Sequence, residues 1–383
     1  MPVAFIRLLP TSILLSVPMA HAATIAMQPH QDDAYRIAAI VRQMDQPLAR
    51  ADGLPRTTLS SDGSWSVELG GQFLEGQRGP QIPAELDARL QAIRLEVMLQ
   101  RERQGAPAQA LEFRFDGHSL EAHYPERPRP ATRVATEVTD VFVSASHGYY
   151  LHGKLGWQLQ RPLSNGMVED LVTPRFADRL VAALQGDGYQ VALSRSRQLV
   201  LHPVAGQPWW QMAARYNAQA LYPARPDIWQ SYADRDTPLR EYNDDIRTRP
   251  LMANEIGAGA LVHLHTNAAA SAAATGAMGF HQPGRGEDQR LGHVLLCAMR
   301  DAIQALPQYH DYRVRVQPMG GNYGENRLAL APSILLELGF HTNPQDAAAL
   351  QDPVFQEAVA QGLRQGYAEF RLGAGAEGEP VCQ

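Results

Sequence analysis

The chain is nearly free of lysine and of cysteine. Lys154 is the only lysine among 34 basic residues, 40 residues are acidic, and the formal net charge is −6 with no block of like charges. A nucleic-acid groove or a patch for anionic membranes needs clustered positive charge, so the sequence favours neither partner. The two cysteines, Cys297 and Cys382, are too few for a disulfide framework. The fold must therefore rely on an apolar core, for which 383 residues that are 45% apolar are sufficient.

Long hydrophobic runs are also missing, apart from one near the start of the chain. Arg7 precedes an apolar run over residues 8–18, and Ala20-His21-Ala22 supplies the small-x-small pattern that a signal peptidase recognises. The run is shorter than the roughly 20 residues that span a bilayer. We therefore expect a signal peptide over residues 1–22, a mature chain that begins at Ala23 without a membrane anchor, and a periplasmic or secreted location.

Residues 23–130 are predicted to form a small α+β domain followed by a linker. Leu86, Leu90, Ile93 and Val97 recur at helical spacing, which predicts a helix over 83–105 that buries one face. The alternating segments 111–115 and 119–124 flank a turn at 116–117, which predicts a hairpin. The proline-spaced stretch 125–130 is typical of a linker.

Residues 131–372 alternate apolar strands with helices, which predicts an α/β fold with a mainly parallel twisted sheet and flanking helices. We expect strands over 140–146, 189–195, 260–265, 276–281 and 333–338. Helices are expected from Thr173-Pro174 to 186, from Glu287 to before Pro307, and after the caps Asn343 and Asp352. Residues 373–383 are predicted to be a disordered tail.

Polar side chains stand where three of these strands end. His147 and His265 follow two strands, Glu337 follows a third, and Glu169 lies before the first crossover helix. The carboxyl ends of parallel strands meet at one edge of a sheet, where ligands bind. Two imidazoles and a carboxylate suffice for a catalytic zinc with one open position. Each residue alone has an ordinary structural explanation, except that Glu337 is costly to bury without a partner.

The motifs around these residues resemble the zinc-dependent N-acetylmuramoyl-L-alanine amidases. The resemblance covers about residues 138–372, and its most specific parts are His265-x-Asn267-Ala and Glu337-Leu-Gly-Phe-x-x-Asn343-Pro. It implies that His147, Glu169 and His265 hold zinc and that Glu337 is the catalytic carboxylate. It also implies hydrolysis of the amide between N-acetylmuramic acid and L-alanine, with peptidoglycan or muropeptides as the partner.

The resemblance has departures, and alternatives remain open. Ser144-Ala145-Ser146 and Tyr149-Tyr150 make the loop at His147 bulkier than is usual for the family. This change prompts a second hypothesis, a peptidoglycan-binding module that has lost turnover. A third is a zinc peptidase that cuts another cell-wall bond. Residues 23–130 have three possible roles: targeting the wall, restraining the active site, or supporting the fold.

Two further groups of residues are not predicted to bind the zinc. His263 is predicted to be structural or to support the ligands, and His152, His281 and His341 are reserve ligands. The aromatic residues of segment 196–250, among them Trp209 and Tyr216, are predicted to form a small satellite core rather than a sugar platform.

Overall fold

The computed structural model describes residues 29–44, 54–61, 63–74, 81–106, 109–126, 139–376 and 382. The predicted signal peptide, residues 127–130 of the predicted linker, and most of the predicted tail lie outside the described residues. Among the described residues, no helix is both long and apolar enough to cross a membrane. The described part forms two units, one before residue 127 and one after residue 138, which we call the N-terminal and C-terminal units.

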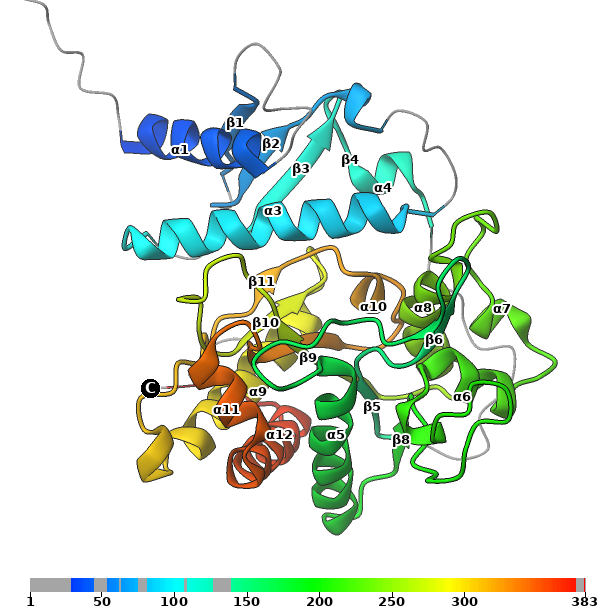
Figure 1. Ribbon diagram of the computed structural model, residues 1–383. Helices are drawn as coiled ribbons and strands as arrows, with labels where there is room; N and C mark the ends of the chain where they lie inside the picture. Colours follow the sequence, from blue (N-terminus) through cyan, green and yellow to red (C-terminus); the bar gives the residue numbers. More distant parts are fainter. Residues whose placement is uncertain are drawn as a thin grey trace, which may run out of the picture.

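The N-terminal unit is a four-stranded sheet with helices packed on it (Figure 1). Strands β2 and β3 pair in parallel, and the two outer pairs are antiparallel. Its elements are α1 (Pro29–Met44), β1 (Arg56–Leu59), β2 (Trp65–Glu68), the 3-10 helix η1 (Gly71–Leu74), α3 (Ala84–Arg103), β3 (Leu111–Phe115), β4 (His118–Ser119) and α4 (Leu120–His123). The unit has an apolar cluster of its own, which includes Trp65, Leu90 and Phe115.

The predicted hairpin is only partly confirmed. Asp116 and Gly117 have φ of 51° and 76°, as a tight two-residue turn requires, and β3 pairs with β4. The second strand is wrong beyond Ser119, because the chain continues as helix α4. Leu120 and Tyr124 stand four residues apart, and in this conformation both are buried in the unit's apolar cluster.

Helix α3 buries two faces rather than the one that its sequence predicted. Leu86, Leu90, Ile93 and Val97 pack into the N-terminal unit, as expected. Met98 and Leu99 pack in a different apolar cluster, with residues of the C-terminal unit such as Met278 and Phe340. Figure 1 accordingly shows α3 lying between the four-stranded sheet and the C-terminal unit.

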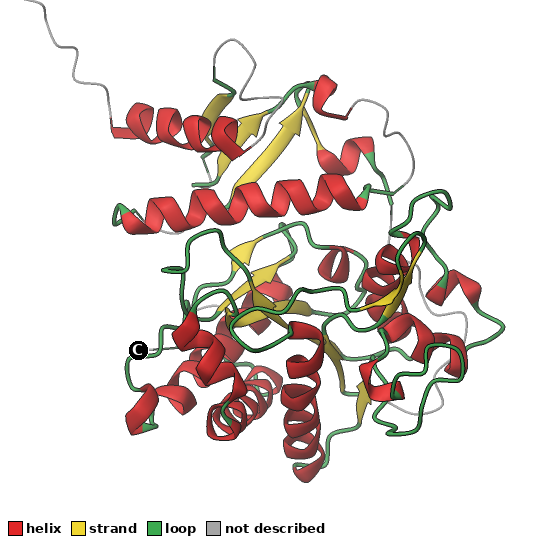
Figure 2. Ribbon diagram, in the orientation of Figure 1, coloured by secondary structure: helices red, strands yellow, loops and turns green. Residues whose placement is uncertain are grey.

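The C-terminal unit contains a six-stranded sheet in the order β11-β10-β12-β9-β5-β8. Only the pairing of β10 with β12 is antiparallel, so the predicted mainly parallel sheet with flanking helices is confirmed (Figure 2). The strands are β5 (Val141–Ala145), β8 (Val191–Leu193), β9 (Ala260–Asn267), β10 (Met278–His281), β11 (Met319–Gly320) and β12 (Ser333–Phe340), with β6 (Tyr150–His152) and β7 (Gly156–Gln158) forming a separate hairpin. The helices are α5 (Glu169–Gly186), α6 (Ala214–Leu221), α7 (Pro226–Trp229), α8 (Arg240–Glu255), α9 (Gly286–Gln304), α10 (Gly324–Arg327), α11 (Pro344–Gln351) and α12 (Pro353–Arg371), with 3-10 helices η2 (Trp209–Gln211) and η3 (Pro307–Tyr309).

Alternation along the strands separates the two faces of this sheet. Val262, Ile334 and Leu336 point into the main core, together with apolar residues of α5, α9 and α12. Leu261 packs on the other face with residues of α8, and Leu335 packs there in the cluster that contains Met98 of α3. Because His265 and Glu337 are an even number of residues from Leu261 and Leu335, they lie on the face that α8 and α3 cover.

Helix α5 starts earlier than its sequence suggested. We expected Thr173 to cap the helix, but the helix begins at Glu169 and contains Pro174. A proline inside a helix removes one backbone hydrogen bond and leaves the carbonyl four residues earlier without its usual donor. That carbonyl, of Asp170, accepts a hydrogen bond from Arg195 Nη1 at 2.8 Å instead. A buried arginine therefore substitutes for the missing N–H.

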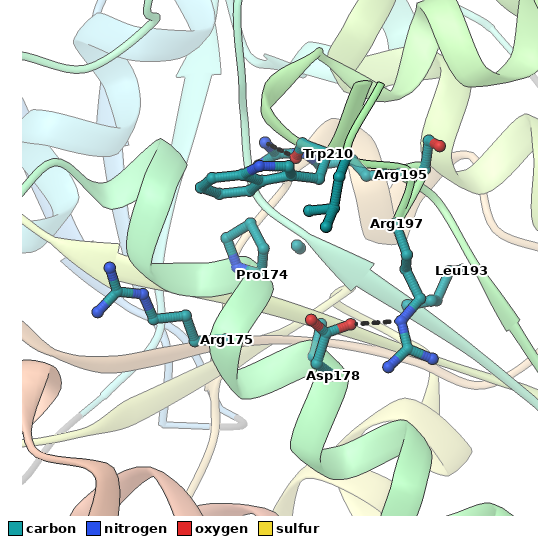
Figure 3. Close-up of a pocket in the computed structure, with 11 residues that line it drawn as sticks. Pro174, Arg175, Asp178, Leu193, Arg195, Arg197 and Trp210 are labelled. Carbon is teal, nitrogen blue, oxygen red and sulfur yellow. Dashed lines mark hydrogen bonds and ion pairs between the residues drawn. The ribbon is translucent and has the colours of Figure 1, made fainter. Parts of the chain in front are cut away.

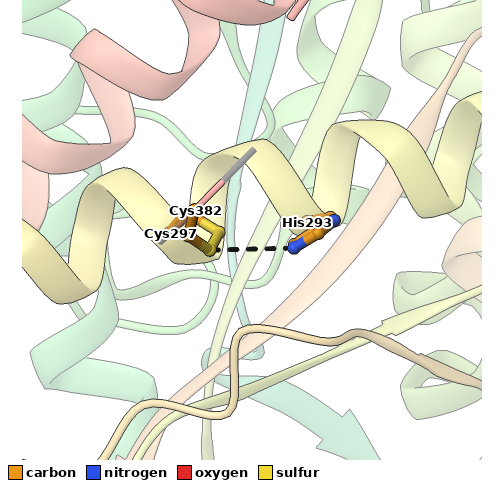
Figure 4. A group of neighbouring side chains, drawn as sticks. All are labelled: His293, Cys297 and Cys382. Carbon is orange, nitrogen blue, oxygen red and sulfur yellow. Dashed lines mark hydrogen bonds between the residues drawn. A yellow bond between two sulfur atoms is a disulfide. The ribbon is translucent and has the colours of Figure 1, made fainter. Parts of the chain in front are cut away.

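The C-terminal end of the unit follows its sequence signals closely. Asn343 accepts hydrogen bonds from the backbone N–H groups at the start of α11, and Asp352 does the same for α12, so both predicted caps are confirmed. Cys382 is disulfide-bonded to Cys297 of α9, next to His293 (Figure 4). The pair links the end of the chain to a helix 85 residues earlier.

Candidate metal centre

The three predicted ligands meet at one point. Their candidate ligand atoms all lie within 4.8 Å of one another, and all three side chains are buried. Glu169 Oε1 lies 3.6 Å from His147 Nε2 and 3.3 Å from His265 Nδ1. His147 follows β5, His265 belongs to β9, and Glu169 is the first residue of α5. Segments more than a hundred residues apart thus converge at one edge of the sheet.

The backbone at His147 is unusual. His147 has φ of 52°, in the left-handed region that few residues other than glycine adopt. Gly148 follows with φ of 148°, and a Cβ at that position would lie 2.6 Å from the backbone nitrogen of Ala213. The sharp turn depends on a glycine at position 148. It aims the imidazole of His147 at Glu169.

The geometry fits a tetrahedral metal ion. Ligands at about 2.0–2.2 Å from a tetrahedral zinc are about 3.3–3.6 Å from each other, which is the range of the two distances from Glu169 Oε1. His147 Nε2 is fully buried and has no hydrogen-bond partner within the described residues. A buried polar atom without a partner is costly, and a metal ion at this point would satisfy it.

The charges of the site also suit a cation. Burial alone would raise the pKa of Glu169, but a hydrogen bond with His265 and the charge of Arg161 oppose it and hold the pKa at about 2. Burial, together with the charges of Arg161 and Arg249, lowers the pKa of His147 well below its usual value. Glu169 is therefore ionised and His147 is neutral, as metal ligation requires.

A chain of hydrogen bonds fixes the ring of His147. The carboxylate of Asp245 only accepts, so the amide nitrogen of Gln160 faces it, with Nε2 to Oδ2 at 2.9 Å. Oε1 of Gln160 then faces His147 Nδ1 at 2.8 Å, so Nδ1 must donate. The lone pair of His147 is therefore on Nε2, which points toward Glu169 and His265. Such outer contacts orient metal ligands in proteins generally.

A buried arginine supports both histidines from behind. The guanidinium of Arg249, on α8, is fully buried; Nη2 donates to Asp245 at 2.5 Å and Nη1 to Glu325 at 3.0 Å. The same two nitrogens lie 3.4 Å from His147 Nδ1 and 3.5 Å from His265 Nε2. Because His147 Nδ1 donates to Gln160 and arginine only donates, Arg249 acts through the carboxylates that it binds. Asp245 fixes Gln160, and Glu325 Oε1 lies 3.6 Å from His265 Nε2.

Glu337 lines the same small cavity as His147 and His265. It pairs in register with His265 on the neighbouring strand, and the β12 ladder shifts its register directly after it. Its Oε2 is buried without a hydrogen-bond partner among the described residues. Burial and the charges of Glu169 and Glu325 raise its pKa well above the usual value, although Arg161 opposes this. Glu337 is therefore suited to holding a proton near the three clustered side chains.

The other histidines do not join the cluster. Both ring nitrogens of His263 are buried without partners in the described chain, but His263 is not among the clustered ligands. The reserve ligands are occupied elsewhere: His341 contacts Thr266 Oγ1, His281 contacts a backbone carbonyl, and His152 accepts from two backbone N–H groups.

Most of the aromatic segment lies apart from the cluster, but Tyr242 lines the cavity and stacks on His147, with ring centroids 6.2 Å apart. Trp209 packs against a small apolar cluster that contains Met212 and Tyr216, so the predicted satellite core is confirmed for this part of the segment. A larger cavity of about 290 Å³ lies beside Trp210, Pro174 and Arg195 (Figure 3), and its lining includes none of the four predicted site residues. The cationic group of Arg195 is already bound to four backbone carbonyls.

Sequence reasoning missed the residues that surround the ligands. Asp245 and Arg249 are four residues apart on a helix, a spacing that indicates an ion pair, but nothing in the pattern placed that pair behind two histidines. Gln160 and Arg161 lie in an irregular loop with no motif. Asp87 and Gln91, which line the cavity from α3, come from outside the segment that carries the resemblance.

Several solved structures are similar to this chain. CwlD amidase from Clostridioides difficile, solved in complex with the GerS lipoprotein, shares 16% identity, with 61% of this chain and 98% of that one covered and a TM-score of 0.42. The catalytic domain of CwlV from Bacillus (Paenibacillus) polymyxa var. colistinus shares 19% identity over 61% and 98%, with a TM-score of 0.39. An N-acetylmuramoyl-L-alanine amidase from Clostridium difficile 630 shares 18% over 63% and 100%, with a TM-score of 0.41.

A search of curated proteins found no match. The sequence profile of one family matches residues 141–369, which is more than half of the chain. This chain belongs to the N-acetylmuramoyl-L-alanine amidase family.

Proposed function

We propose that this enzyme is an exported zinc amidase that cleaves the bond between N-acetylmuramic acid and L-alanine in peptidoglycan. His147, Glu169 and His265 would hold the zinc, and Glu337 would be the general base and acid. The observation that carries the proposal is the convergence of three ligand atoms within 4.8 Å of one another, one of them buried without a partner in the described chain.

The metal ligands, Glu337 and the residues behind the ligands would have different roles in the reaction. Zinc held by His147, Glu169 and His265 would supply Lewis acidity and would lower the pKa of a water molecule to about 7. A cation held by the three ligands would offset the charges of Glu169 and Glu325 that raise the pKa of Glu337, so Glu337 would be ionised. It would then accept the proton from the attacking water and return it to the amide nitrogen, which leaves as the amine of L-alanine. Arg249, Asp245 and Gln160 hold the imidazoles in place, so that the ligand set does not have to reorganise during the reaction.

The central test replaces Glu337 by glutamine. Because general acid–base catalysis contributes about 10²–10⁴-fold, Glu337→Gln should lower muropeptide hydrolysis by at least about 100-fold. The zinc content should stay near one per chain, since Glu337 is not one of the three ligands. Glu357→Gln is the matched control, because Glu357 is exposed on α12 and pairs with Arg179 rather than with a residue of the metal centre. Unchanged hydrolysis in Glu337→Gln would contradict the assigned role.

The same experiment separates the alternative functions. Mass spectrometry of the products should show free stem peptides that begin with L-alanine. A different cut would indicate a zinc peptidase of other specificity. Tight binding of sacculi by the wild-type protein without any product would indicate a binding module.

The proposed export has a separate test. The mature protein recovered from cells should begin at Ala23, which N-terminal sequencing would show. A chain that keeps residues 1–22 would contradict cleavage.

A further inference from the structure

The cavity at the candidate metal centre has a roof that does not belong to the C-terminal unit. Asp87, Ala88 and Gln91, from the first turns of α3, line it opposite His147 and Glu337. Asp87 also lies near Glu325, which contacts His265. The helix that joins the two units therefore passes directly over the residues that we propose to be catalytic.

The space beneath α3 is small in comparison with the proposed substrate. The cavity has a volume of about 90 Å³, which is room for about three water molecules at about 30 Å³ each. Sites that bind organic ligands usually enclose about 300–1,000 Å³. While α3 stays in this position, it narrows the space beside Glu337 into which the scissile part of a muramoyl-peptide must enter.

The two ends of α3 are held by different kinds of contact. At its C-terminal end, Met98 and Leu99 pack into a shared apolar cluster, and Glu102 pairs with Arg313 and Arg315. Apolar burial of this kind is lost in full when the surfaces separate. This end of α3 is the more firmly attached.

The end above the metal centre is held by a polar cluster that we call the lock: Gln81, Glu126, Ser231, Ala233 and Arg247. The side chain of Gln81 donates to Ser231 O at 2.8 Å and accepts from Ala233 N at 2.6 Å. Arg247 binds both carboxylate oxygens of Glu126, and its Nε donates to Ser231 Oγ at 2.9 Å. Water can replace the hydrogen bonds of Gln81 at a modest net cost, because a typical protein hydrogen bond contributes only about 0.5–1.5 kcal/mol. The bidentate pair of Arg247 and Glu126 is charge-assisted and is therefore the strongest contact of the lock.

We propose that α3 is a plug over the active site, and that the site opens when the lock separates and the first turns of α3 lift. This inference rests on the proposed function, since it concerns access of a muropeptide to the same residues. The apolar end of α3 stays in contact and serves as the pivot. The N-terminal unit keeps its shape during this motion because it has an apolar cluster of its own. Of the three roles open for residues 23–130, the structure thus favours restraint of the active site.

The test weakens the lock without changing any residue of the metal centre. The double variant Gln81→Ala, Glu126→Gln removes the hydrogen bonds of Gln81 and the charge and bidentate pairing of Glu126, and Gln81→Ala alone is the milder second variant. Glu96→Gln is the matched control, because within the described part of the chain Glu96 accepts only from Gln100 and Arg103 of α3 itself. Each zinc-loaded full chain is mixed with EDTA, and zinc loss is followed over time beside hydrolysis of soluble muropeptides.

In the double variant, zinc loss should be at least about tenfold faster than in the wild type, since the bidentate pair lost is of the stronger, charge-assisted kind. Gln81→Ala should show a smaller change in the same direction, and Glu96→Gln should match the wild type. Hydrolysis should rise together with zinc loss.

Two results separate the plug from the proposed function. Wild-type rates of zinc loss and hydrolysis in both lock variants, with melting temperatures that show folded proteins, would overturn the plug and leave the amidase assignment intact. Faster zinc loss with no hydrolysis in any protein would support the plug and contradict the proposed reaction.

Discussion

Gln160 gives the sharpest test of how the candidate metal centre is supported. Replacing it by leucine keeps a side chain of similar size but removes the acceptor for His147 Nδ1, which lies 2.8 Å away. The imidazole is then free to rotate or to move its proton to Nε2, the nitrogen that faces Glu169. Loss of such an outer contact typically weakens metal binding by about 10–100-fold. The expected loss of zinc-binding free energy is therefore about 1.4–2.7 kcal/mol.

The assay is a competition titration of zinc against a chromophoric chelator, for wild type, Gln160→Leu and a control. Gln158→Leu is the control, because Gln158 lies two residues away and donates to Tyr150 Oη rather than to a ligand of the cluster. The control should bind zinc as the wild type does. An equal zinc dissociation constant for Gln160→Leu and the wild type would refute the argument that this hydrogen bond fixes the ligand.

Three further predictions concern stability. Burial is the main cause that raises the pKa of Asp87 to about 6. The native state therefore binds more protons than the unfolded state between about pH 4 and 6, and it loses stability as the pH rises through that window. Denaturant titrations should show that Asp87→Asn removes up to about 3 kcal/mol of this pH dependence. Cys382→Ser opens a loop of 85 residues and should lower the free energy of unfolding by about 2–4 kcal/mol, whereas equal stability under oxidising conditions would show that the bond does not form. Gly148→Ala should lower the melting temperature and the zinc content together, because its Cβ would collide with the Ala213 backbone; a variant with normal zinc content would contradict the account of that turn.

The sequence was informative about the ligands because strand ends are visible in it. His147, His265 and Glu337 each follow a run of apolar residues, and parallel strands bring such ends to one edge. Glu169 was placed in the right region for an incomplete reason. The sequence predicted a loop ahead of a cap at Thr173, whereas the helix starts at Glu169 and Arg195 compensates for Pro174. A compensation from a residue more than twenty positions away has no local signal.

The contacts behind and above the ligands were beyond sequence reasoning for a different reason. Arg249 and Gln160 act through tertiary distances that no spacing rule encodes. On α3, Met98 and Leu99 stand directly after the regular apolar stripe that ends at Val97. In the sequence they look like part of that stripe, although they face the C-terminal unit. Their second partner emerges only when the two units are seen together.

The two-faced burial of α3 bears on how the protein can be handled as fragments. The family match begins at residue 141, so a fragment trimmed to the matched residues would lack α3. Met278, Phe280, Met319, Leu335 and Phe340 would then lose an apolar partner that the full chain provides. A contiguous apolar face left in water promotes self-association. The conventional boundary of the catalytic region is therefore expected to yield an aggregating product. Because the other face of α3 packs into the N-terminal unit, the soluble minimum should include that unit as well.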